Sequence, residues 1–191
     1  MRITISILAL ALGLAASGRV AAEPLERRGF TLEFGLGFGA FHEIPSSYPN
    51  DSHLGQSNFS FSLGGFLRPD TALLFHMQGV ASMFEDGFTV DMAGFGGVHV
   101  QHWLKDRLFV GGGAGMAIYS YGDALLPYQD KELHGLGVGL RSGYSLASSR
   151  THSLHLALEV SAGFFSELTT ITETLVFEWQ WMPSNRRVPA P

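Results

Sequence analysis

The 191-residue sequence contains no cysteine. Disulfide bonds, thiolate metal sites, cysteine nucleophiles and the lipid-bearing cysteine of a lipoprotein are therefore excluded. Small exported domains often depend on disulfides for stability, so this chain needs another source of stability. A closed barrel is such a source, because every strand has two neighbours and no edge is left unpaired.

Charged residues are scarce as well. They make up 15% of the chain, whereas soluble domains average about 25%. Twelve Lys and Arg stand against 17 Asp and Glu, which gives a formal net charge of −5. This balance argues against a nucleic-acid partner, because such a partner requires a basic patch or stripe.

Long apolar runs are also missing, apart from one at the start of the chain. Arg2 precedes an apolar stretch from Ile3 to Ala16, and the small residues Val20, Ala21 and Ala22 follow it. These are the three parts of a signal peptide, so we expect residues 1–22 to be removed on export. The alternative is a retained anchor, but the run is shorter than the ~20 residues of a spanning helix.

The rest of the chain alternates in polarity. From Phe30 to Phe41, apolar residues such as Leu32 and Phe34 occupy every second position, with Thr31 and Glu33 between them. Strands have a side-chain period of two, so such a segment has one apolar face and one small or polar face. The pattern recurs at 30–41, 58–67, 72–82, 88–103, 108–119, 135–146, 153–165 and 170–182. It predicts an all-β fold: an eight-stranded antiparallel up-and-down transmembrane β-barrel over residues 23–182, with a short periplasmic C-terminal tail at 183–191.

The connections between these segments alternate in length. Residues 42–57 and 120–134 form long connections, while the turns near Arg68, Lys105 and Ser149 are short. Outer-membrane barrels have short periplasmic turns and longer external loops, so the long connections are expected to face outside. They contain candidate contact residues for an external partner: Ile44, Tyr48, Leu54, Leu125, Leu126 and Tyr128.

Aromatic residues fall near the ends of the predicted strands. Such residues favour the membrane interface, although strand propensity alone also enriches them. The predicted periplasmic girdle is Phe30, Trp103, Tyr144, Trp179 and Trp181, and the predicted outer girdle is Phe41, Phe84, Phe88, Tyr119, Tyr121 and Phe164.

The last predicted strand reads Leu175-Val176-Phe177-Glu178-Trp179-Gln180-Trp181. With eight alternating strands, a signal peptide and tight inner turns, the chain resembles the small outer-membrane barrels of the OmpA/OmpX type. The resemblance implies a bacterial outer-membrane location. It also implies that the barrel-assembly machinery reads Leu175, Phe177, Trp179 and Trp181 as an assembly signal. The chain departs from the family by continuing past its last aromatic residue.

An eight-stranded barrel has an interior just wide enough for side chains to fill. The inward-facing residues are therefore expected to form a polar network: Glu33, His76, Asp91, His99, Arg141, His155, Glu159 and Glu178. A turn centred near Arg150 would place Arg141 directly opposite Glu159, which predicts an ion pair inside the barrel. Buried charges need such partners, because an isolated one is very costly.

Glu33 and Glu178 lie on the first and last strands, which become neighbours when the barrel closes. Two close carboxylates resemble an acid/base couple. The simpler interpretation is that each carboxylate binds an Arg, a His or a water molecule. No metal site or cofactor is predicted, because His42 and His53 share their connection with Glu43 and Asp51 without the spacing of a ligand set.

No catalytic residues are predicted either. A lipid-modifying triad requires Ser, His and an acid near the outer boundary. Ser166 and Glu167 lie there with only His134 nearby, while His152 and Ser153 fall at the opposite end. The glycines at 111–115 lie within a strand pattern and precede no helix, so they do not form a phosphate loop. They are expected to leave room for Phe66, Phe95 and Phe109.

The sequence thus favours a non-enzymatic outer-membrane barrel with a plugged interior. The expected task is envelope integrity or surface interaction through the loops, and the expected partners are outer-membrane lipid, lipopolysaccharide and an external protein or surface ligand. Three alternatives stay open: a small pore or carrier of apolar ligands, a lipid A-modifying barrel enzyme, and a soluble exported lipocalin-like barrel. The last would place the apolar face inside.

Overall fold

The computed structural model describes residues 25–45, 51–83, 89–123, 131–183 and 186–187, and the described chain is built from strands and turns. No helix in these ranges has the length and apolar character to cross a membrane. The strands are β1 Leu25–Glu26, β2 Gly29–Pro45, β3 Asp51–Arg68, β4 Thr71–Met83, β5 Thr89–Trp103, β6 Leu108–Asp123, β7 Lys131–Ser148, β8 His152–Phe164, β9 Leu168–Trp181 and β10 Arg186–Arg187.

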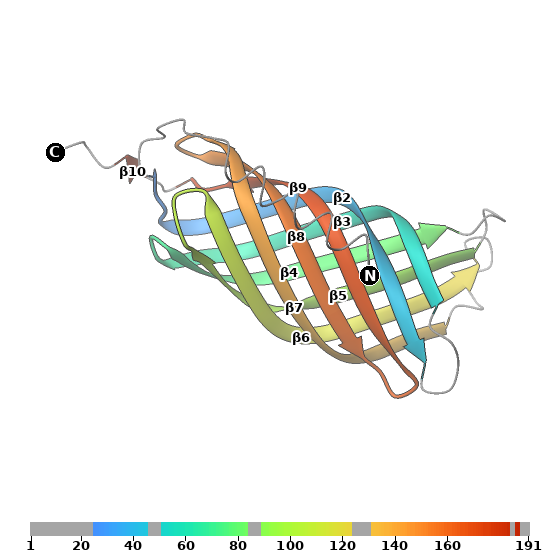
Figure 1. Ribbon diagram of the computed structural model, residues 1–191. Helices are drawn as coiled ribbons and strands as arrows, with labels where there is room; N and C mark the ends of the chain where they lie inside the picture. The colour runs from blue at the N-terminus through green and yellow to red at the C-terminus, as the bar shows by residue number, and fades with distance from the viewer. Residues whose placement is uncertain (1–24, 46–50, 84–88, 124–130, 184–185, 188–191) are drawn as a thin grey trace.

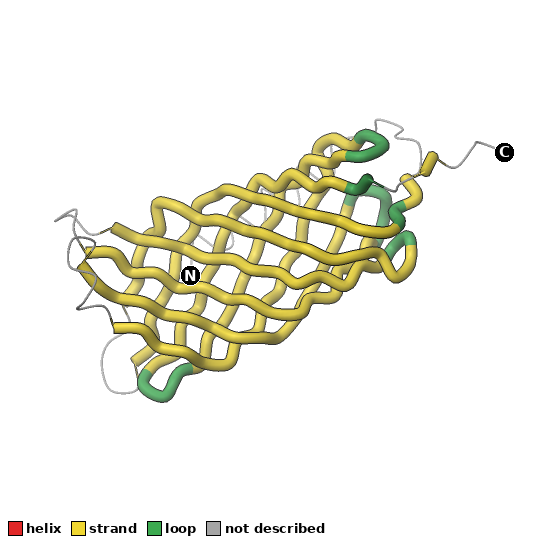
Figure 2. The backbone as a smooth tube through the Cα atoms, turned by 180° about the vertical axis from the view of Figure 1, so that it is seen from behind, coloured by secondary structure: helices red, strands yellow, loops and turns green. Residues whose placement is uncertain are grey.

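Strands β2 to β9 form a closed antiparallel barrel, each pairing with its neighbours in sequence and β9 pairing back with β2 (Figure 1). The predicted fold is confirmed. The short β1 pairs with β10 beside one mouth of the barrel, with Leu25 opposite Arg187. We call this mouth, which also carries the turns after β3, β5 and β7, the turn end; the opposite mouth is the loop end (Figure 2).

Several strands run further toward the loop end than their polarity pattern predicts. β2 and β3 stay paired as far as Glu43 opposite Asp51, and β6 and β7 as far as Tyr121 opposite Lys131. The backbone ladder continues because its hydrogen bonds do not depend on side-chain polarity. The prediction of Ile44 and Leu54 as loop residues was therefore wrong, since both lie on strands. The other predicted loop contacts lie outside the described residues: Tyr48, Leu125, Leu126 and Tyr128.

Most of the large apolar side chains on the strands face outward. Leu136 is 76% exposed and Leu140 is 67% exposed on the surface of β7. The inward positions carry buried charges instead, such as Arg141 and Glu159. This distribution is the reverse of a lipocalin-like barrel, which holds its apolar residues inside.

Some of the predicted girdle does lie on the outer surface at the turn end. The Phe30 and Trp181 rings meet edge to face at 6.3 Å, and the His152 ring stacks on Trp179 at 5.3 Å. The girdle prediction was wrong for three residues that point inward and are at most 6% exposed: Trp103, Phe41 and Tyr119. They occupy inward-facing positions near strand ends, where their rings close the mouths. Phe84 and Phe88 lie outside the described residues.

These inward rings belong to two apolar clusters that enclose the polar interior. The loop-end cluster comprises Phe41, Val80, Ala93 and Tyr119, with Leu133, Phe165 and Leu168 packed against them. The turn-end cluster comprises Trp103, Phe109 and Ala157, with Phe66 packed against them. The interior is therefore layered, with apolar side chains at both ends and charged side chains between them.

Inward glycines make room for the large rings, as the sequence predicted for Phe95 and Phe109. A Cβ atom on Gly143 would lie 2.3 Å from Cζ of Phe109, and one on Gly139 would lie 3.0 Å from the Phe95 ring. The Phe109 ring cannot easily retreat, because it is fully buried and packs against Trp103 at 4.9 Å.

We therefore expect Gly143→Ala to lower the free energy of unfolding by about 1–3 kcal/mol through overpacking. Urea titration of the refolded protein in detergent micelles measures this loss. The matched control is Gly96→Ala, whose new methyl group would have its nearest neighbour, Met77 Cγ, at an ordinary 3.5 Å. Equal stability of the two variants would contradict the packing assignment.

Candidate functional site

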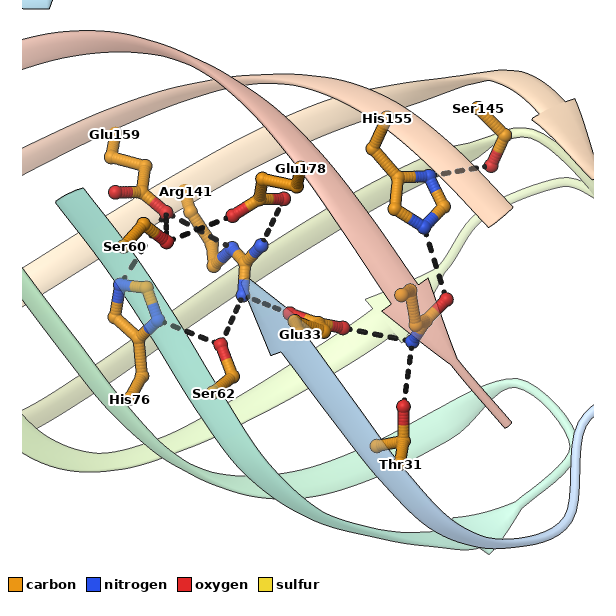
Figure 3. Close-up of polar contacts among 11 residues, drawn as sticks. Thr31, Glu33, Ser60, Ser62, His76, Arg141, Ser145, His155, Glu159 and Glu178 are labelled. Carbon is orange, nitrogen blue, oxygen red and sulfur yellow. Dashed lines mark hydrogen bonds and ion pairs between the residues drawn. The ribbon is translucent and has the colours of Figure 1, made fainter. Parts of the chain in front are cut away.

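The centre of the barrel is a single guanidinium surrounded by three carboxylates (Figure 3). Arg141 Nη1 lies 2.8 Å from Glu33 Oε2, and Nη2 lies 2.5 Å from Glu178 Oε2. Its Nε lies 3.7 Å from Glu159 Oε1. All four residues are at most 3% exposed. The guanidinium and the three carboxylates therefore form one cluster that is buried away from solvent.

The predicted register of Arg141 opposite Glu159 is observed. This cross-strand pair nevertheless has the longest of the three contacts, because the guanidinium extends across the interior to β2 and β9. Glu33 and Glu178 lie on these two strands, which pair where the barrel closes. Shared binding of Arg141, rather than an acid/base couple, accounts for both carboxylates. Arg141 thus connects β7 to the closing seam of the barrel.

Two serines and a histidine from β3 and β4 complete the cluster. Ser60 Oγ donates to Glu159 Oε1 at 3.2 Å and to Glu178 Oε1 at 3.0 Å. Ser62 Oγ accepts from Arg141 Nη1 at 3.2 Å and is hydrogen-bonded to His76 Nδ1 at 2.9 Å. His76 Nε2 lies 3.4 Å from Glu159 Oε1, a contact that is an ion pair when the imidazole is protonated. The cluster therefore draws on β2, β3, β4, β7, β8 and β9.

The hydrogen bonds continue toward the turn end through Gln180. Its Nε2 donates to Glu33 Oε1 at 2.8 Å and to Thr31 Oγ1 at 3.1 Å. Its Oε1 pairs with His155 Nε2 at 3.0 Å, and His155 Nδ1 pairs with Ser145 Oγ at 2.9 Å. The alternation of the last strand predicts that Gln180 faces inward, as Glu178 does, but Gln180 was not included in the predicted network.

Two predicted network members lie apart from these bonds. The His99 ring packs 4.8 Å from the His76 ring and 5.4 Å from Phe95, and within the described chain neither of its nitrogens has a hydrogen-bond partner. Asp91 is buried nearer the loop end, opposite Ser82 on β4. The hydrogen bonds and ion pairs of Figure 3 join the other six: Glu33, His76, Arg141, His155, Glu159 and Glu178.

Ser62, His76 and Glu159 have the order of a hydrolytic triad, which sequence reasoning did not find. Each is at most 1% exposed, and the Ser62 hydroxyl is already bound by Arg141. A nucleophile needs space for a substrate carbonyl beside it, and this hydroxyl is enclosed by side chains. The arrangement is suited to holding the interior together. No group of three or more His, Asp or Glu in the described ranges is placed to hold a metal ion.

A second buried arginine closes the turn end. The Arg27 guanidinium lies 3.7 Å from the centre of the Trp103 ring and donates to the Asp106 carbonyl oxygen at 2.6 Å. Burial lowers the pKa of Arg27 to about 10, and the Asp106 carboxylate opposes the shift. Arg27 therefore remains charged at neutral pH. The chain then enters β2 through Gly29, whose φ of 68° favours glycine.

The sequence matches no protein-family model, and a search of curated proteins finds no match. Solved structures do match. Neisserial surface protein A is 13% identical, with a TM-score of 0.60 over 81% of this chain and 97% of that one. The attachment invasion locus protein Ail of Yersinia pestis, solved with the heparin analogue sucrose octasulfate, is 10% identical, with a TM-score of 0.54 over 80% of this chain and 99% of that one. This chain has the fold of the small eight-stranded outer-membrane barrels, of the OmpA/OmpX type. At these identities the likeness extends to the fold alone.

We expect Arg141→Met to lower the free energy of unfolding by about 3–5 kcal/mol, because it leaves buried carboxylates without their cation. Urea titration in micelles, followed by tryptophan fluorescence, measures the change.

Double and quadruple variants then separate the partners. Adding Glu159→Leu should recover only part of the loss, because Glu33 and Glu178 make the shorter contacts. Adding Glu33→Gln and Glu178→Gln as well should recover most of it. An identical loss in the single, double and quadruple variants would show that these groups are not coupled.

Proposed function

We propose that this protein is a non-enzymatic barrel of the bacterial outer membrane, with a filled interior, that serves envelope integrity or contacts external partners through its loop end. One observation carries the proposal: apolar side chains cover the outside, while the buried charges are paired inside. Lipid hydrocarbon is the solvent that favours this arrangement. The fold shared with Neisserial surface protein A supports the same general kind of protein.

The filled interior favours a structural role over a pore. The Arg141 cluster occupies the middle of the barrel, and apolar clusters containing Trp103 and Tyr119 occupy its two ends. Arg27 and the β1–β10 pair add a further layer at the turn end. Solutes would meet packed side chains at each level.

The arrangement of the ends supports an orientation. Short turns lie at the turn end together with β1 and β10, which fits the periplasmic side of an outer-membrane barrel. The loop end would then face outward, amid lipopolysaccharide, where its connections would meet an external protein or surface ligand. In this proposal residues 1–22 act as the export signal and residues 183–191 as a periplasmic tail.

The proposed assembly signal lies on the last barrel strand. Leu175, Phe177, Trp179 and Trp181 share the outward face of β9, and Phe177 is 58% exposed. Because β9 pairs with β2 to close the barrel, recognition of this face by the barrel-assembly machinery would act on the strand that completes the fold.

Spin labels test the membrane orientation in refolded protein in lipid vesicles. Labels at the outward residues Leu136 and Leu140 should be relaxed by oxygen, which concentrates in hydrocarbon. A control label at the exposed turn residue Ser149 should be relaxed by a water-soluble nickel complex. Recovery of the protein in buffer without detergent, or aqueous relaxation at Leu140, would contradict the proposal.

Planar-bilayer recording tests the filled interior. We expect no steady conductance from the unaltered protein, and none from Arg27→Ala, because the Arg141 cluster remains in place. Arg141→Ala, Glu33→Ala and Glu178→Ala remove the central side chains, and Trp103→Ala and Tyr119→Ala open the two apolar end clusters. All five changes combined should give measurable channels. Steady channels in the unaltered protein would support a pore instead.

A further inference from the structure

Charge is strongly segregated along the barrel axis. At the turn end, eight basic residues stand against the three acidic residues Glu26, Asp70 and Asp106. The basic residues are Arg27, Arg28, Arg68, Lys105, Arg107, Arg150, Arg186 and Arg187.

The half of the barrel toward the loop end has the opposite balance. Within the described ranges, Lys131 is the one lysine or arginine there. Seven acidic residues accompany it: Glu43, Asp51, Asp91, Asp123, Glu132, Glu167 and Glu173. The protein is therefore dipolar, with a basic turn end and an acidic loop end.

The basic residues are distributed around the turn-end mouth rather than gathered on one side. Arg28 precedes β2, Arg68 ends β3, Lys105 and Arg107 lie between β5 and β6, and Arg150 lies between β7 and β8. All are exposed except the half-buried Arg107. We call these five residues the basic ring.

The basic ring lies next to outward-facing aromatic residues. Phe30 is 43% exposed and Trp179 is 40% exposed on the outer surface of the same end, and Trp181 packs against Phe30. Tryptophan side chains favour the level of the lipid headgroups. The ring residues lie at the strand ends or in the turns, at the same end of the barrel as these aromatic residues.

We propose that the basic ring binds the anionic phosphate headgroups of phospholipids in the leaflet at the turn end. This inference rests on the proposed membrane function and adds the lipid class that the barrel selects. Guanidinium groups match phosphate oxygens in geometry as well as charge. A ring around the whole circumference suits a lipid annulus, whereas a protein partner would require a patch on one side.

Fluorescence quenching tests the proposal directly. Trp179 and Trp181 lie on the outside near the ring, while Trp103 is buried in the interior. The refolded protein is placed in phosphatidylcholine vesicles that contain brominated phosphatidylglycerol or brominated phosphatidylcholine, and quenching gives the relative association constant of the two lipids. We expect phosphatidylglycerol to be favoured by about fivefold for each ring residue that contacts a headgroup. High salt should reduce this preference.

Charge variants with matched controls identify the source of the preference. The ring variant combines Arg68→Gln, Lys105→Gln and Arg150→Gln. It should bring the ratio of the association constants of phosphatidylglycerol and phosphatidylcholine close to one. The control combines Glu132→Gln, Glu167→Gln and Glu173→Gln at the loop end and should keep the preference. Folding of each variant is checked by its heat-dependent gel mobility, and a ring variant that does not fold is replaced by the single changes, each expected to lower the ratio.

The outcomes separate this inference from the proposed function. Absence of quenching by either brominated lipid would show that the protein does not insert, which defeats both. Quenching with a ratio of one, or a preference unchanged in the ring variants, would overturn the inference and leave the membrane function intact. Competition by inorganic phosphate at constant ionic strength, or loss of the preference on addition of an anionic cell-wall polymer, would assign the ring to a soluble or polymeric ligand instead.

Discussion

Desolvation of one guanidinium is the constraint on which the interior depends. Arg141 is held among side chains that exclude water, so its charge has to be balanced by protein groups. Glu33 and Glu178 supply close contacts from the closing seam, and Glu159 supplies a longer one from the neighbouring strand. Each carboxylate is in turn bound by Ser60, Gln180 or His76, so the members of the network are coupled.

The apolar ends and the charged middle reinforce each other. Trp103 and Phe109 on one side and Phe41 and Tyr119 on the other limit the access of water to the ion pairs, and electrostatic attraction strengthens where water is excluded. The pairs in return fix the positions of the strands around the closing seam, where Glu33 and Glu178 meet Arg141. A barrel closed in this way gains rigidity from its interior as well as from its backbone ladder.

The alternating sequence was sufficient to predict the eight strands, their antiparallel order and the inward face of the charged residues Glu33, Asp91, Arg141, Glu159 and Glu178. It also predicted Arg141 opposite Glu159, because a short turn fixes the register of a hairpin. It did not predict that Arg141 makes closer contacts with Glu33 and Glu178, since a period of two gives the face of a residue but not which strands approach across the interior. The inward rings of Trp103, Phe41 and Tyr119 were missed for a different reason. They were assigned to the girdle by their place near the strand ends, although the same alternation places each of them on the inward face.

Because the interior is filled, we expect the function of the barrel to depend on its surfaces. Catalysis and passage of solutes both need space beside reactive or selective groups, and here the hydroxyl of Ser62 and the imidazole of His76 are bound by their neighbours. The two mouths of the barrel differ in charge, because the turn end carries the basic ring and the loop end carries an excess of carboxylates. In the proposed orientation, lipid headgroups lie beside the mouths and not the interior, so the basic ring is the feature through which a filled barrel of this kind would select its lipid neighbours.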